Sequence, residues 1–276
     1  MDLPAGIGGA FAFLIGAVTG SFVTVVAYRL PREISIVGPR SFCESCERSL
    51  PIWTNLPILA YIGLRGRCVM CGAPIRFRNF LAELGLAVAA LYLYLDFPLG
   101  SAIARFVFCA ALFTIAIIDY DWRIIPNLIT FPGTAIGIAS AWLLMPDEVG
   151  LPGSLAGIVL GAGVLFIIGY LYEMVRGREG VGMGDVWLLA MIGAFVGWPG
   201  VIFTLFFGSM MGAVGGLAMA FSGREAAEPV GDPSADLPET DVSILRTEVP
   251  FGPFLSLAAG FYALFQPQLM RWYLGG

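Results

Sequence analysis

Long apolar stretches recur along this chain of 276 residues and leave little room for a water-soluble fold. A helix needs about 20 predominantly apolar residues to cross the hydrocarbon core of a bilayer. Eight segments reach or approach this length: 5–28, 81–97, 101–118, 128–145, 152–172, 186–198, 200–221 and 251–267. Only 13% of the residues are charged, against about a quarter in soluble domains. The sequence therefore predicts an all-α polytopic membrane protein with about eight transmembrane helices.

The arginines orient this predicted bundle. All 15 basic residues are arginine, and 13 of them lie in alternate loops, eight of these between the first and second apolar segments. Basic residues are enriched in cytoplasmic loops, so these loops are expected to face the cytoplasm and both termini the outside. Arg105 and Arg271 are the two exceptions.

The predicted topology divides the chain into three parts. Residues 1–28 form the first transmembrane helix, 29–80 a small folded cytoplasmic insert, and 81–276 the transmembrane core. Within the core, residues 222–250 carry seven acidic residues and four prolines but few large apolar side chains. Such a segment buries too little surface to order itself, so we expect a flexible acidic loop. The net charge of −5 argues against a nucleic-acid partner.

Four cysteines in the 29–80 insert have the spacing of a metal site. Cys43 and Cys46 are followed, after 21 residues, by Cys68 and Cys71. Each CxxC pair presents two thiolates from a tight turn, for which Gly72 is suited, and four sulfurs suit a structural tetrahedral Zn²⁺. Two disulfides are disfavoured because the insert is expected in the reducing cytoplasm. Four unrelated thiols are the remaining alternative.

The absence of histidine and lysine restricts the available chemistry. It excludes Ser-His and Cys-His pairs, Schiff-base lysines and phosphate-binding P-loops. Carboxylates at membrane depth are costly and are functional candidates by default. Asp119 ends the third apolar segment, and Asp185, after Gly182 and Gly184, begins the sixth. Both are therefore expected at the cytoplasmic ends of their helices, and the two glycines allow close approach beside Asp185.

Two such carboxylates sharing one proton form an acid–base pair. The ionised member takes a proton from an attacking water, while the protonated member polarises the carbonyl and then protonates the leaving amine. This is the arrangement of an aspartic protease. The alternative is a structural role, with Asp119 solvated near the headgroups or paired with Arg123. From the residues alone, Asp121 is not separated from Asp119.

Several motifs, in their order along the chain, resemble the bifunctional type IV prepilin peptidase family of GxGD membrane aspartic proteases. They are Gly20-Ser21-Phe22, Arg29-Leu30-Pro31, Pro39-Arg40-Ser41, the CxxC pairs, Asn55-Leu56-Pro57, Cys71-Gly72-Ala73-Pro74, Ile118 to Asn127, Gly182 to Val186, and Phe251 to Leu255. The resemblance extends over nearly the whole chain. Trp187 stands where the family commonly has lysine.

The resemblance implies an enzyme of the bacterial inner membrane. Family members cleave the basic leader of prepilins and pseudopilins at the cytoplasmic face, and many then methylate the new N-terminal amine with S-adenosylmethionine. By this likeness Asp119, seven residues before Pro126, and Asp185 are the catalytic pair, and the cysteine insert accompanies methylation. The sequence shows neither the residues that bind S-adenosylmethionine nor the oligomeric state.

Two other functions remain open at this point. One is a cleaving enzyme without methyltransferase activity. The other is a non-enzymatic membrane scaffold, or a carrier whose aspartates move protons or cations, because intramembrane carboxylates also mark proton paths.

Overall fold

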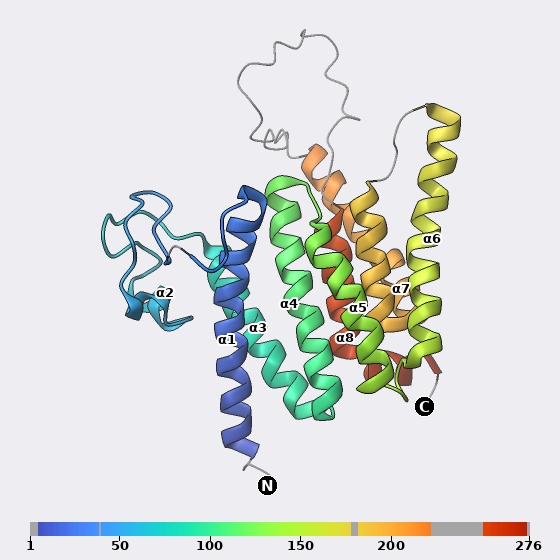
Figure 1. Ribbon diagram of the computed structural model, residues 1–276, viewed down its shortest axis with the longest axis horizontal. Helices are drawn as coiled ribbons and strands as arrows, with labels where there is room; N and C mark the ends of the chain where they lie inside the picture. Colours follow the sequence, from blue (N-terminus) through green and yellow to red (C-terminus); the bar gives the residue numbers. More distant parts are fainter. Residues whose placement is uncertain (1–4, 39, 178–181, 222–250, 275–276) are drawn as a thin grey trace.

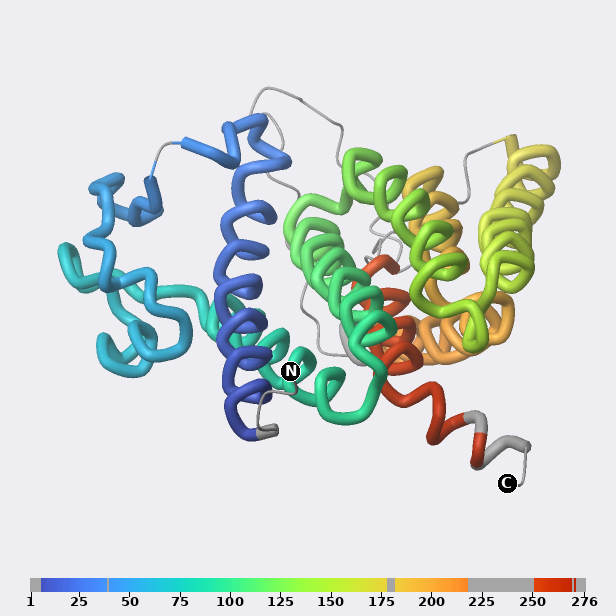
Figure 2. The backbone as a smooth tube through the Cα atoms, turned by 60° about the horizontal axis from the view of Figure 1, so that its bottom comes forward, coloured from blue at the N-terminus to red at the C-terminus, as the bar shows by residue number. Residues whose placement is uncertain are grey.

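The computed structural model describes residues 5–38, 40–177, 182–221 and 251–274. The helices within these ranges are α1 (Ala5–Arg29), η1 (Leu30–Arg32), η2 (Ile52–Asn55), α2 (Leu59–Gly63), α3 (Phe77–Asp96), α4 (Leu99–Trp122), α5 (Asn127–Leu143), α6 (Gly150–Arg176), α7 (Met183–Phe221) and α8 (Gly252–Leu274). The long helices stand side by side in one bundle, and the segment between α1 and α3 projects from one side of it (Figures 1 and 2).

Helix α7 consists of two antiparallel halves. Its continuity breaks at Gly197, whose φ of 69° and ψ of −178° are not helical. Gly184, in the first half, packs against Ile125 at the α4–α5 connection, and Gly212, in the second half, packs against Phe251 beside the start of α8. Both of these positions lie at the same end of the bundle, so the chain reverses at Gly197. Only glycine adopts this backbone conformation readily.

The observed helices correspond to the eight predicted apolar segments, with 186–198 and 200–221 as the halves of α7. Five helices in the described part of the chain, namely α1, α3, α4, α6 and α7, are long and apolar enough to cross a membrane. The all-helical membrane fold is therefore confirmed. Helix α4 continues to Trp122, beyond the predicted end at residue 118. The predicted acidic loop, 222–250, lies outside the described residues.

Glycines bring the central helices into close contact. The α6–α7 pair meets where Gly157 faces Gly193, and a Cβ atom on either residue would clash with the backbone of the other helix. Ser154 adds a buried hydrogen bond by donating its hydroxyl to the Ala194 carbonyl at 2.9 Å. Helices in lipid associate through such small residues and interhelical hydrogen bonds, because the lipid itself is apolar.

Arg105 departs from the predicted charge pattern because it belongs to the protein interior. Its side chain is 4% exposed and pairs with Glu148. Its guanidinium also donates to the Gln266 side chain at 2.6 Å and to the Ala263 carbonyl, and it stands over the Phe97 ring. Arg105 is thus a buried link between α4 and α8, where a charged side chain requires partners of this kind.

Candidate functional site

Asp119 lies in the last turn of α4, and its side chain is only 5% exposed. Its Oδ2 accepts a hydrogen bond from the backbone N–H of Gly252, the first residue of α8, at 3.0 Å. A Cβ atom at position 252 would stand 2.6 Å from the same oxygen. The close approach between this carboxylate and the start of α8 therefore requires glycine at position 252.

Asp185 lies in the first turn of α7 and is half-buried. It is close enough to Asp119 for their charges to interact electrostatically. Gly184 allows this packing, because a Cβ atom there would lie 2.9 Å from the Ile125 Cβ, whereas one on Gly182 would make only an ordinary contact, 3.6 Å from the Asp185 Oδ2. The structure thus places the two predicted aspartates near each other at one end of the bundle, beside the start of α8.

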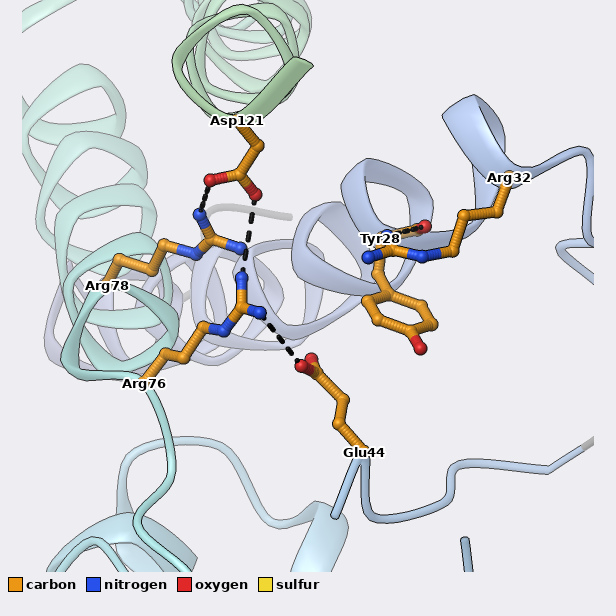
Figure 3. Close-up of polar contacts among 6 residues, drawn as sticks. All are labelled: Tyr28, Arg32, Glu44, Arg76, Arg78 and Asp121. Atoms are coloured by element: carbon orange, nitrogen blue, oxygen red, sulfur yellow. Dashed lines mark hydrogen bonds and ion pairs between the residues drawn. The ribbon is translucent and has the colours of Figure 1, made fainter. Parts of the chain in front are cut away.

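Asp121 occupies a different environment from Asp119. It forms ion pairs with Arg78 and, at 3.6 Å, with Arg76, and Arg76 also pairs with Glu44 of the cysteine insert at 3.2 Å (Figure 3). Within the described ranges, no arginine forms an ion pair with Asp119. Asp121 therefore belongs to a polar link between α4 and the insert, and this contact distinguishes it from Asp119, a difference that the residues alone did not reveal.

Asp119 and Arg123 are joined by a backbone hydrogen bond and not by the ion pair that the structural alternative would require. The backbone N–H of Arg123 donates to the Asp119 carbonyl at 2.9 Å, and Arg123 ends α4 in a left-handed conformation with φ of 53°. This contact caps the helix. It leaves the Asp119 carboxylate directed to Gly252.

The four cysteines of the insert form a compact cluster of free thiols. All four sulfur atoms lie within 4.8 Å of one another, and the Sγ atoms of Cys43 and Cys71 are 3.8 Å apart. A disulfide bond would be about 2.0 Å long. Tetrahedral coordination with Zn–S bonds of about 2.3 Å places neighbouring sulfurs about 3.8 Å apart. Cys43, Cys46, Cys68 and Cys71 could therefore hold a metal ion, as their spacing predicted.

Each cysteine pair sits in the same kind of turn. The N–H of Glu47 donates to the Cys43 carbonyl at 2.8 Å, and the N–H of Gly72 donates to the Cys68 carbonyl at 2.9 Å. The fourth residue after the first cysteine is left-handed in both turns, with φ of 55° at Glu47 and 73° at Gly72. Gly72 therefore serves the turn expected of it, while the first turn forces Glu47 into a conformation that glycine would adopt more easily.

The close packing of the four sulfur atoms favours a bound cation. A backbone hydrogen bond at Ala73 lowers the pKa of Cys71, but desolvation and the three neighbouring thiols outweigh it and raise this pKa to about 11. Without a cation the cluster therefore favours thiols over thiolates, whereas a bound metal stabilises the thiolate form.

Two residues at this end of the molecule, Gly252 and Glu83, have contacts for which the sequence indicated no role. Gly252 precedes Pro253, and proline is typical of the first turn of a helix, where the backbone N–H groups have no partner within the helix. Glu83 lies within the apolar helix α3, and its Oε2 accepts the Ile58 N–H at 2.7 Å. A carboxylate in a membrane helix could have drawn attention to Glu83.

Comparisons with known proteins agree with these observations. Residues 14–97 match the family described as the bacterial peptidase A24 N-terminal domain, and residues 106–217 match the type IV leader peptidase family. The chain is 35% identical to a Burkholderia pseudomallei protein named prepilin leader peptidase/N-methyltransferase, over 99% of this chain and 90% of the relative. Proteins with the same name from Myxococcus xanthus and Pseudomonas putida are 33% and 30% identical, covering 98% and 94% of this chain and 95% and 91% of the relatives. No solved structure matches.

Proposed function

The chain belongs to the type IV leader peptidase family, and we propose that Asp119 and Asp185 are the carboxylates that perform its peptidase reaction. Its function is that of a prepilin leader peptidase and N-methyltransferase. The observation that carries the assignment of the pair is the position of Asp119, in the last turn of α4, and Asp185, in the first turn of α7, at the same end of the bundle in a chain that has no histidine or lysine.

The surroundings of the pair support different roles for its two members. The Gly252 N–H donates to the Asp119 carboxylate from the N-terminus of α8, where the helix dipole favours negative charge. Asp119 is accordingly the ionised base that removes a proton from water as its oxygen attacks the scissile carbonyl. Asp185 holds the shared proton, polarises the carbonyl oxygen and then protonates the departing amine. Two adjacent carboxylates favour this single-proton state because both charges together repel.

The replacement Gly252→Ala is expected to lower the kcat of leader cleavage by about 10²-fold, because a misplacement of about 1 Å at a catalytic group has this effect. The added methyl group would overlap the Asp119 carboxylate. The KM for prepilin should change little, since the replacement acts on the position of the Asp119 carboxylate alone. Gly163→Ala in α6 is the matched control, because nothing lies within 4 Å of a Cβ atom there. Equal kcat values in the two variants would contradict the role given to Gly252.

The metal proposed for the cysteine cluster is Zn²⁺, bound by Cys43, Cys46, Cys68 and Cys71. The support is the four-sulfur donor set and the 3.8 Å Sγ–Sγ distance, which suit a closed tetrahedral structural site. In this role zinc stabilises the fold of the insert and takes no part in peptide cleavage. S-adenosylmethionine is the proposed methyl donor.

The proposed topology has eight membrane crossings, namely α1, α3, α4, α5, α6, the two halves of α7, and α8. Residues 29–80 and both aspartates then lie at the cytoplasmic face of the bacterial inner membrane, and both termini lie outside. The arginine distribution supports this orientation. The same rule retains a basic prepilin leader inside, so substrate and carboxylates meet at one face. The proposed division of the chain is 1–28, 29–80 and 81–276.

A cleavage assay tests the proposed reaction. Purified protein in lipid nanodiscs, mixed with a prepilin and S-adenosylmethionine, should yield a shortened band on a gel. Mass spectrometry of that band should show a methylated N-terminal amine. A shortened but unmethylated product would indicate a peptidase alone, and an uncut substrate would favour the scaffold or carrier. A pseudopilin in a parallel reaction tests the wider substrate class.

A further inference from the structure

A cavity of about 400 Å³ lies between the cysteine insert and the helices α1 and α3. Its volume falls in the range of small-molecule sites, about 300–1,000 Å³. Ser21 of α1 and Glu83 of α3 line it on the side of the bundle, and Cys43 and Cys68 line it on the side of the insert. The peptidase reaction described above uses none of these residues, so the cavity is available for another ligand.

Aromatic side chains line this cavity at both of its junctions with the bundle. On the α3 side, Tyr61 of the insert stacks on Phe80 with ring centroids 5.0 Å apart. On the α1 side, Tyr28 meets Phe42 edge to face at 6.0 Å. The Tyr28 ring already lies under the Arg32 guanidinium at 3.9 Å, so the Tyr61–Phe80 pair is the part of this lining suited to a planar heteroaromatic group such as adenine.

The polar groups of the lining suit a ligand that carries charges of both signs. Glu83 is a half-buried carboxylate that accepts the Ile58 N–H at 2.7 Å and a hydrogen bond from the Ser21 side chain, and a carboxylate has about four acceptor positions. Asn55 and Asn79 add amide groups that both donate and accept. Arg29 contributes a buried guanidinium.

We propose that this cavity is the S-adenosylmethionine site, with Glu83 opposite the sulfonium, the Tyr61–Phe80 pair against adenine, and Asn79 at the polar edge. The proposal rests on the methyltransferase part of the function described above. The sulfonium is a permanent cation without a hydrogen-bond donor, so a carboxylate recognises it through charge alone. The product S-adenosylhomocysteine lacks this charge, so Glu83 favours donor over product.

The position of the cavity suits the order of the two reactions. Glu44 and Arg76 line it, and the same Arg76 forms the ion pair with Asp121, two residues beyond Asp119 in the last turn of α4 (Figure 3). In this arrangement the ion pairs of Arg76 with Glu44 and Asp121 lie between the methyl donor and the site at which cleavage frees the amine.

The charge of the ligand gives the sharpest test. Binding of S-adenosylmethionine and of S-adenosylhomocysteine to the full-length zinc-loaded protein is measured by calorimetry in nanodiscs. In Glu83→Gln the amide oxygen still accepts the Ile58 N–H, so the fold of the insert is retained. The variant should bind S-adenosylmethionine at least about tenfold more weakly. Its affinity for S-adenosylhomocysteine should stay within about twofold, because a neutral thioether gains little from the carboxylate charge.

Glu33→Gln is the matched control, because Glu33 is an exposed acidic residue of the same insert that lies outside the cysteine turns and does not line the cavity. It should bind both ligands like the unmodified protein. An unchanged S-adenosylmethionine affinity in Glu83→Gln would overturn the proposal. A variant that weakens prepilin binding and leaves S-adenosylmethionine binding intact would overturn it too, and would assign the cavity to the leader.

A second measurement needs no variant. Ultraviolet irradiation of the unmodified protein with radiolabelled S-adenosylmethionine should label peptides containing Tyr28, Tyr61 or Phe80. Label confined to α4–α8 would overturn the proposed location even if Glu83→Gln fails to fold. These outcomes can be told apart from failure of the proposed function. A protein that binds no S-adenosylmethionine anywhere would lose the methyltransferase role itself. Binding of S-adenosylmethionine elsewhere would reject only this cavity.

Discussion

The variant Asp119→Asn is expected to cleave prepilin at least about 10³-fold more slowly than the unmodified protein, and Asp185→Asn should lose as much. General acid–base catalysis contributes about 10²–10⁴-fold, and residues that act as a unit lose nearly the full effect together. Asparagine keeps the shape of aspartate but neither takes up a proton from water nor delivers one to the leaving amine. Initial rates of leader removal, followed on gels with radiolabelled prepilin, measure the effect.

Asp121→Asn is the matched control, since it removes a carboxylate two residues away on the same helix. Asp121 is held by Arg76 and Arg78, outside the proposed pair, so this variant should retain most of the cleavage rate. A folded Asp119→Asn protein should also still methylate pilin that has already been cut. If Asp121→Asn were the inactive variant and Asp119→Asn the active one, the assignment of the pair would be wrong.

Loss of the metal should have the second-largest effect. Freshly purified protein is expected to contain about one zinc per chain, and Cys68→Ser should contain almost none, because a four-thiolate site closes only with all its ligands. The binding energy of structural zinc, about 10–16 kcal/mol in small domains, is largely folding energy. The insert of the variant should therefore be digested by trypsin under conditions in which the unmodified insert resists. Methylation should fall more than cleavage, since the aspartate pair lies in α4 and α7.

Cys109→Ala separates a site-specific effect from the loss of any thiol. Cys109 is buried in α4 and is not part of the cysteine cluster. Metal content, measured by atomic emission, should equal that of the unmodified protein. Fresh protein without metal, or Cys68→Ser with its full complement, would reject the zinc site.

The fold was predictable in outline because its determinants are local. A run of apolar residues specifies a membrane helix wherever it occurs, since lipid leaves no other way to satisfy the backbone. The break within α7 was predicted between the segments 186–198 and 200–221, and the residue that breaks the helix is Gly197. The predicted end of α4 was too early because the apolar run stops at residue 118, whereas the helix continues through Asp119 and Asp121 and Arg123 caps it.

The environment of the candidate site was less predictable. Spacing alone was enough to group Cys43, Cys46, Cys68 and Cys71, because two short turns bring each pair of sulfurs together. No spacing rule connects Asp119 with Gly252, which are 133 residues apart. Trp187, which replaces the expected cation, packs edge to face against Phe131 with ring centroids 4.8 Å apart.

The sequence by itself determined that this chain is a helical membrane protein, that its cysteines suit a metal, and that its chemistry must come from carboxylates, cysteines, hydroxyls, the backbone or a bound metal. These follow from composition and short-range spacing, which act within a few turns of one helix or one loop. The family likeness selected Asp119 over Asp121, but only the tertiary structure gave the physical difference between them, because that difference lies in what other helices bring to each carboxylate. The start of α8 supplies an N–H to one, and α3 with its preceding segment supplies two guanidinium groups to the other.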